Sequence, residues 1–147
     1  RAACGEATFS VGTLRVPARS SHLSLIGMFV QWYAHHAGLS DEACYELEVA
    51  IDEACTNVIR HAYGAGKPGG ITLHCTPLNR GLQVDIWDQG IPFDPTEGGR
   101  IAQQKQACDP ASVGFGLSMI RQFADDVHHQ WDEQEGNRLM ITKYKKG

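Results

Sequence analysis

The longest regular pattern in the chain is a run of apolar residues at helical spacing between positions 44 and 64. Leu47, Ile51, Ala54 and Val58 recur every three or four residues, so on an α-helix they fall on one stripe. A stripe of this kind is typical of a helix that packs on the core of a domain. The pattern therefore predicts one long central helix.

Four polar residues share the flank of that stripe. Glu46, Glu53, Asn57 and His61 are separated by four or seven residues, which puts them on one side of the predicted helix. At the rim of a core, a carboxylate can orient a nucleophile, and an amide oxygen is a suitable ligand for Mg²⁺. The spacing alone is more typical of a solvated edge without chemistry, so these residues need support from other motifs.

The rest of the chain alternates between strand and helix signals. Helical spacing predicts helices at 20–37 and 115–124, and Ser40 or Asp41 caps the central helix. The segment 92–113 has no sustained period and is predicted to be a loop that acts as a lid. Alternating apolar and polar residues predict strands at 8–16, 71–78, 81–88, 127–131 and 137–145.

Composition limits the class of protein. The chain has 147 residues, of which 42% are hydrophobic and 20% charged, and this predicts one soluble globular domain spanning residues 1–147. A net charge of −4 argues against a nucleic-acid surface, and no apolar run is long enough to span a bilayer. The five cysteines include no CxxC pair and fit a reducing cytoplasm, with Cys44 and Cys55 expected in the core.

Two clusters of basic residues are expected at the surface. His128 and His129 lie beyond the last helical pattern and have no evident partner in the sequence. Lys143, Lys145 and Lys146 are expected to form a solvated strand end.

A first glycine-containing stretch follows a predicted strand. Asp88 ends that strand, and Gly90 comes two residues later in a turn braced by proline. A carboxylate fixed at a strand end can accept a hydrogen bond from an exocyclic amino group such as that of adenine, and glycine lets a flat ring approach the backbone. An ordinary Asx turn would produce the same pattern.

A second stretch, Gly114-Phe115-Gly116-Leu117, opens a predicted helix. The free amides of a helix N-terminus form an anion site that suits phosphate groups. In this order, the polar helix flank, the strand end with its Asp and Gly, and the glycine-opened helix together indicate one nucleotide pocket.

The stretches EVAIDEACTNVIRHAYG, DQGIPFDP and GFGLSMI resemble the GHKL ATP-binding superfamily, which includes histidine kinases, gyrase, the ninety-kilodalton heat-shock chaperone and MutL proteins. Within it, these three stretches are most similar to those of the anti-sigma-factor serine kinases of bacterial partner-switching systems. The resemblance covers nearly the whole chain. It implies an α+β fold, a two-layer α/β sandwich with a mixed, mainly antiparallel sheet covered on one face by helices.

The resemblance also implies roles for individual residues. Glu53 would be the base or orienter for an attacking hydroxyl, and Asn57 would bind Mg²⁺. Asp88 would accept a hydrogen bond from the adenine amino group, and Gly90 would lie under the ring. The phosphates of ATP would be held by Gly114, Phe115, Gly116 and Leu117.

One position departs from the family pattern. Many members carry a Gly-Thr pair in the last hairpin, and its Thr helps to hold the adenine. The corresponding stretch here reads Glu135-Gly136-Asn137-Arg138, and Thr142 lies further along the strand. The base contact is therefore the part of the site that the resemblance leaves undefined.

The function implied is that of an ATP- and Mg²⁺-dependent serine/threonine protein kinase that acts as an anti-sigma factor and phosphorylates a small antagonist protein. Binding of a sigma factor and formation of a homodimer remain open, and no nucleic-acid or membrane partner is expected. The alternative is a module of the same fold that uses nucleotide only to grip a partner. A third interpretation, the catalytic domain of a histidine kinase, is disfavoured because the PFDP motif is unlike that group.

Overall fold

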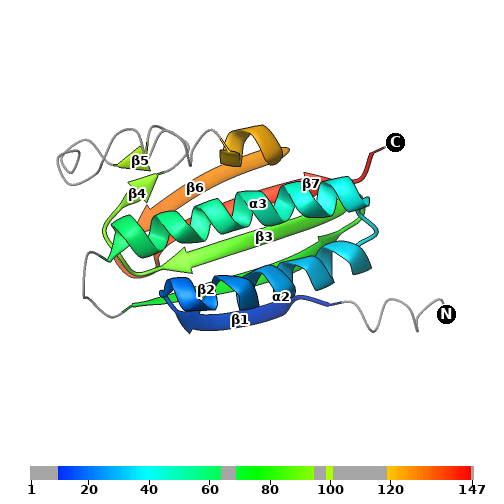
Figure 1. The fold of residues 1–147 in the computed structure, drawn as a ribbon. Helices are drawn as coiled ribbons and strands as arrows, with labels where there is room; N and C mark the ends of the chain where they lie inside the picture. The colour runs from blue at the N-terminus through cyan, green and yellow to red at the C-terminus, as the bar shows by residue number, and fades with distance from the viewer. Residues whose placement is uncertain (1–9, 64–68, 95–98, 101–118, 147) are drawn as a thin grey trace.

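The computed structural model describes residues 10–63, 69–94, 99–100 and 119–146. Its main sheet has five strands in the order β1-β2-β3-β7-β6, and α2 and α3 lie side by side over one face (Figure 1). Every described strand pair is antiparallel. The predicted α+β sandwich is confirmed, although the described strands include no parallel pair.

The elements have the following bounds. The helical segments are η1 (Ser20–His22), α2 (Leu23–His36), α3 (Asp41–Asn57) and η2 (Val58–Ala62). Residues 119–123 are also helical. The strands of the main sheet are β1 (Gly12–Pro17), β2 (Gly70–Leu78), β3 (Gly81–Asp88), β6 (Asp126–Asp132) and β7 (Gly136–Tyr144). A separate short pair comprises β4 (Phe93–Asp94) and β5 (Gly99–Arg100).

The core lies between the two helices and the covered face of the sheet. Leu47, Ile51 and Ala54 are almost fully buried, as the apolar stripe predicted. The thiols of Cys44, Cys55 and Cys75 are free and buried. The sheet contributes every second residue of its central strands, namely Ile71, Leu73, Cys75, Leu82, Val84, Ile86, Leu139 and Ile141.

The loop between α2 and α3 follows local rules. Gly38 has a φ of 85°, a left-handed conformation that glycine adopts without strain, and it ends α2. Ser40 then caps α3, because its side-chain oxygen accepts a hydrogen bond of 3.1 Å from the backbone N–H of Ala43. None of the described helices is long and apolar enough to cross a bilayer.

The central helix changes its winding after Asn57. The prediction of one continuous α-helix to position 64 is wrong there, because Val58–Ala62 forms a π-helical turn. The carbonyl of Ala62 accepts a hydrogen bond of 2.8 Å from the N–H of Ile91, so this end of the helix is held by the loop that follows β3. Turns of this type occur frequently at functional sites.

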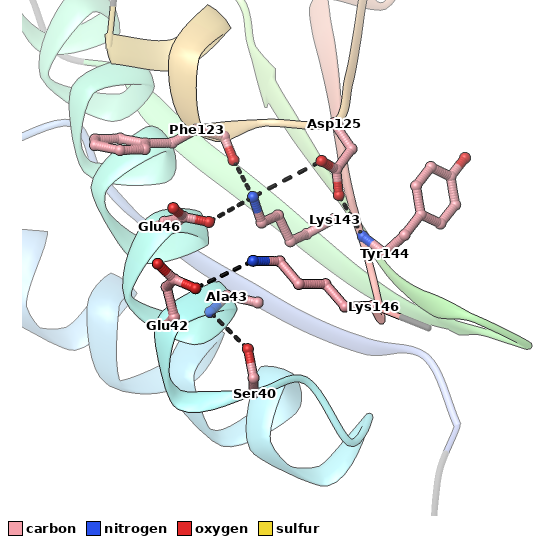
Figure 2. A network of polar contacts seen from close by, with 9 residues as sticks. All are labelled: Ser40, Glu42, Ala43, Glu46, Phe123, Asp125, Lys143, Tyr144 and Lys146. Atoms are coloured by element: carbon pink, nitrogen blue, oxygen red, sulfur yellow. Dashed lines mark hydrogen bonds and ion pairs between the residues drawn. The ribbon is translucent and has the colours of Figure 1, made fainter.

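A buried lysine near the C-terminal end of β7 joins the sheet to α3. The Lys143 side chain is 8% exposed; its Nζ lies 2.8 Å from Oε1 of Glu46 and donates to the carbonyl of Phe123 at 2.6 Å (Figure 2). The prediction of a solvated strand end is therefore wrong for Lys143, whereas Lys146 is exposed and pairs with Glu42.

Glu46 is held by this ion pair at the start of α3. This flank residue is thus engaged in an ion pair and is not among the residues that line the pocket near Asn57.

Candidate functional site

A pocket lies between the C-terminal half of α3, the π-helical turn and the covered face of the sheet. Its empty volume is about 340 Å³, part of which is open to solvent. Its walls are mostly apolar, with one carboxylate, two amides and one imidazole. The lining residues are Ala54, Asn57, Val58, Ala62, Ile86, Asp88, His129, Asn137 and Leu139.

Asp88 has one carboxylate oxygen fixed by the protein. Oδ1 accepts hydrogen bonds of 2.9 Å from the N–H of Gly90 and 2.9 Å from Nδ2 of Asn137. Among the described residues, Oδ2 has no hydrogen-bond partner. A side chain that is only 5% exposed thus retains one acceptor for a group in the pocket.

The electrostatic environment of Asp88 contains opposing contributions. Burial raises the pKa of the Asp88 carboxyl, while the hydrogen bonds from Asn137 and Gly90 and the nearby His129 act to lower it. The hydrogen bonds favour the ionised form, which is the form that can only accept.

Asn137 is the site residue that sequence reasoning missed. It stands opposite Asp88 in the register of β3 and β7. Its side chain, which is 3% exposed, donates to Asp88 and also to the carbonyl of Ile91 at 2.7 Å. Thr142 pairs with Gln83 instead and does not replace it. Position within the last hairpin was the only signal in the sequence for this residue.

His129 also belongs to the pocket. The prediction that it lies at the surface is wrong, because it is half-buried and its Nε2 is 3.0 Å from Oδ1 of Asn137. His128 is exposed, as predicted, and pairs with Asp126 on its own strand. The difference arises because neighbouring strand residues point to opposite faces of a sheet.

Asn57 is the residue that was predicted to bind Mg²⁺. It is 5% exposed, lines the pocket, and has its Nδ2 buried without a hydrogen-bond partner. A buried polar group without a partner is destabilising, so this amide is suited to a bound ligand. Rotating the amide by 180° about χ2 would present Oδ1 instead, which is the atom a cation requires. The described residues contain no cluster of three metal-ligating side chains, so Asn57 would share a cation with the phosphates of a nucleotide.

Glu53 lies one helical turn before Asn57 and is half-buried, but it is not among the residues that line the pocket. Burial and the neighbouring Asp52 raise the pKa of Glu53, while Arg60 opposes the shift. A raised pKa suits a group that accepts a proton during a reaction.

Gly90 and Tyr63 hold the turn after Asp88 against the helix. A Cβ on Gly90 would lie 2.2 Å from the carbonyl oxygen of Ala62, so no other residue fits without movement. The Tyr63 hydroxyl accepts a hydrogen bond of 2.7 Å from the N–H of Gln89 and donates to the carbonyl of Gly70 at 2.6 Å. That Gly90 also lies under a bound ring stays a prediction.

The predicted phosphate-binding residues Gly114, Phe115, Gly116 and Leu117 lie outside the described residues, as does most of the predicted lid at 92–113. Their roles therefore stay predictions.

Comparisons with known proteins identify the family of this chain. The sequence profile of a family described as histidine kinase-like ATPase domain matches residues 16–143. A serine-protein kinase RsbW from Listeria monocytogenes serovar 1/2a is 32% identical over 142 residues, covering 90% of this chain and 85% of that protein. The RsbW of Bacillus subtilis (strain 168) is 26% identical over 144 residues, covering 91% of this chain and 85% of that protein.

A solved structure has the same fold. The crystal structure of the RsbU and RsbW domains of Rv1364c from Mycobacterium tuberculosis matches with a TM-score of 0.56 and 12% identity, covering 91% of this chain and 32% of that longer chain. The resemblance to the GHKL superfamily and to its serine-kinase branch is thus confirmed. The chain belongs to the family of histidine kinase-like ATPase domains.

Proposed function

We propose that the protein is an ATP-dependent serine/threonine protein kinase of the partner-switching type, which phosphorylates a small antagonist protein and acts as an anti-sigma factor. The observation that carries this proposal is the Asp88 carboxylate, fixed through Oδ1 and open through Oδ2 in an apolar pocket that also contains Asn57. The similarity to proteins named serine-protein kinase supports the choice of reaction.

The pocket residues divide the task of holding the nucleotide. Asp88 would accept a hydrogen bond from the amino group of adenine, and the apolar walls would enclose the ring. Asn57 would bind Mg²⁺ through Oδ1 beside the phosphates. The cation would neutralise part of the phosphate charge, which is its general contribution to phosphoryl transfer.

Glu53 would act on the protein substrate. It lies one helical turn before Asn57, and its raised pKa suits acceptance of the proton from an attacking serine or threonine hydroxyl. A module that only binds nucleotide has no need for a proton acceptor there, so Glu53 favours the kinase over the nucleotide-gated binding module.

Partners and location follow from the same proposal. The substrate would be an antagonist protein, and a sigma factor and a second copy of the chain are further candidate partners. We place the protein in the cytoplasm, and the free thiols of Cys44, Cys55 and Cys75 are compatible with that reducing compartment.

The decisive experiment is transfer of label from γ-labelled ATP. The protein is incubated with Mg²⁺ and a candidate antagonist from the same genome, and label is sought on a serine or threonine. Glu53→Gln serves as the matched control because it keeps the shape of the side chain. Label that appears with the parent protein and not with Glu53→Gln supports the kinase. Nucleotide-dependent binding of the antagonist without any label supports the binding module instead.

A further inference from the structure

Three side chains on three adjacent strands form a continuous chain of hydrogen bonds along the pocket. His129 on β6 contacts Asn137 on β7 at 3.0 Å, and Asn137 contacts Asp88 on β3 at 2.9 Å. Strands β6, β7 and β3 are neighbours in the sheet. Asn137 lies directly opposite Asp88, and it is two residues from Leu139, the register partner of His129, so the step from β6 to β7 is diagonal. All three residues line the pocket.

The contacts of Asn137 fix the orientation of its amide. Nδ2 has two hydrogens, and both of its partners, Oδ1 of Asp88 and the carbonyl of Ile91, are acceptors. Oδ1 of Asn137 must therefore face His129, and Nε2 of His129 must carry the proton and donate it. The reverse orientation would bring two acceptors together at Asp88 and lose both bonds.

The direction of donation has a consequence at Asp88. Each hydrogen bond in the chain is donated in the direction of the Asp88 carboxylate. Asn137 donates the last one to Oδ1, so Oδ2 is the oxygen left for the pocket. Without Asn137, the carboxylate would be held by the N–H of Gly90 alone and could rotate. Asn137 thus determines which oxygen faces the pocket, and His129 determines how Asn137 is turned.

We propose that His129 and Asn137 are positioning residues that set the nucleobase specificity of the pocket, by holding Asp88 so that Oδ2 accepts from a base with an exocyclic amino group. This inference rests on the proposed nucleotide-binding function and concerns the same site. Adenine has a donor at this position. Hypoxanthine has a carbonyl oxygen there, and that oxygen would face the carboxylate and be repelled.

The experiment compares ATP with inosine triphosphate, in which only that group of the base is changed. Both nucleotides are titrated with Mg²⁺ into the parent protein and three variants by calorimetry. In His129→Leu the donor is removed, in His129→Gln it is retained on a different side chain, and Asn137→Ala removes the link to Asp88. Thermal melts of every variant check that it is folded.

We expect the parent protein to prefer ATP by at least tenfold. His129→Leu and Asn137→Ala should reduce the preference to less than about threefold, mainly by weakening ATP, whereas His129→Gln should keep most of it. A merely structural role would weaken both nucleotides equally and leave their ratio unchanged. If Asn137→Ala does not fold, the two His129 variants carry the test, because they differ in the presence of a donor.

Each negative result has a distinct meaning. A parent protein that binds neither nucleotide would remove the proposed function. A parent protein that binds both without distinguishing them would remove the adenine contact of Asp88 and with it the role of His129 and Asn137. A parent protein that distinguishes them, with variants that do so equally well, would overturn the role of His129 and Asn137 and leave the kinase proposal intact.

Discussion

Lys143 on β7 and Glu46 on α3 form an ion pair with 2.8 Å between Nζ and Oε1. The same ammonium group donates to the carbonyl of Phe123, at the end of the helical segment 119–123. One lysine therefore joins the last strand, the central helix and the segment that precedes β6. Both partners of Lys143 are at least 20 residues away in the sequence, so the contact forms only in the folded protein.

Replacing Lys143 should test the strength of this junction. We expect Lys143→Met to destabilise the fold by about 1–3 kcal/mol, because it leaves a half-buried carboxylate and a carbonyl without their donor. Urea unfolding measures the change. The control is Lys146→Met, whose exposed pair with Glu42 should contribute much less to stability. Similar effects of the two substitutions would show that Lys143 has no special role.

Asp88→Asn should weaken ATP binding without harming the fold. The new amide can keep its oxygen on the donors from Gly90 and Asn137, so its Nδ2 faces the pocket and offers a donor where an acceptor is needed. Calorimetry should show at least a tenfold loss of affinity, equivalent to about 1.4 kcal/mol.

Asp88→Asn should also change how the free energy of unfolding depends on pH. Burial raises the pKa of Asp88 in the folded protein, so the folded state keeps this proton to a higher pH than the unfolded state. The contribution of Asp88 to stability is therefore greatest at low pH and is lost as pH rises through the folded pKa. Relative to the parent protein, Asp88→Asn should be more stable at pH 7 than at pH 4. Urea unfolding at both values tests this, and a parallel pH dependence of the two proteins would contradict it.

Glu53 should matter for transfer and not for binding. Glu53→Gln is expected to lower the rate of phosphorylation by about 10²-fold or more and to leave ATP affinity nearly unchanged. Single-turnover kinetics and calorimetry separate the two effects.

Substitution of the neighbouring Asp52 provides a control, because it should move the pH–rate profile and keep the transfer activity. Asp52 raises the pKa of Glu53, while Arg60 lowers it. Asp52→Asn should therefore keep the transfer activity but move the acidic limb of the pH–rate profile to lower pH, because Glu53 then loses its proton more readily. An unmoved profile would argue that Glu53 is not the proton acceptor.

Asn57→Ala should separate metal binding from stability. The Asn57 amide has a buried Nδ2 without a partner, so its removal is expected to change the free energy of unfolding by less than about 1 kcal/mol. ATP should bind the parent protein more tightly with Mg²⁺ than with EDTA, and this difference should shrink in Asn57→Ala. Calorimetric titrations in both buffers provide the comparison. Equal affinities in the parent protein would remove the metal from this site.

The features predicted well from the sequence are those determined locally. The burial of Leu47 and Ile51 follows from helical spacing, and the capping of α3 by Ser40 follows from residue type at a helix start. The adjacent strands β2 and β3 are equally local, because each follows from its own alternating segment, predicted at 71–78 and 81–88.

The features that were missed depend on contacts between distant segments. Lys143 is buried because Glu46 lies opposite it, and no pattern near either residue indicates the other. His129 and His128 look alike in the sequence, and only the register of β6 turns one of them into the pocket. Asn137 could be suspected from its place in the last hairpin, but its two acceptors come from a strand and a loop more than forty positions earlier in the chain.

The π-helical turn Val58–Ala62 has a consequence for how this region can change. Such a turn has hydrogen bonds that span five residues, so it contains one residue more than an α-helix with the same ends. Deleting one residue from it would give a regular helix, but everything after the deletion would rotate by about 100°. Tyr63 would then swing away from Gly70 and Gln89, and the turn after β3 would lose its support. A shorter, more regular helix and an intact pocket are mutually exclusive here, which makes the length of this segment as tightly constrained as its composition.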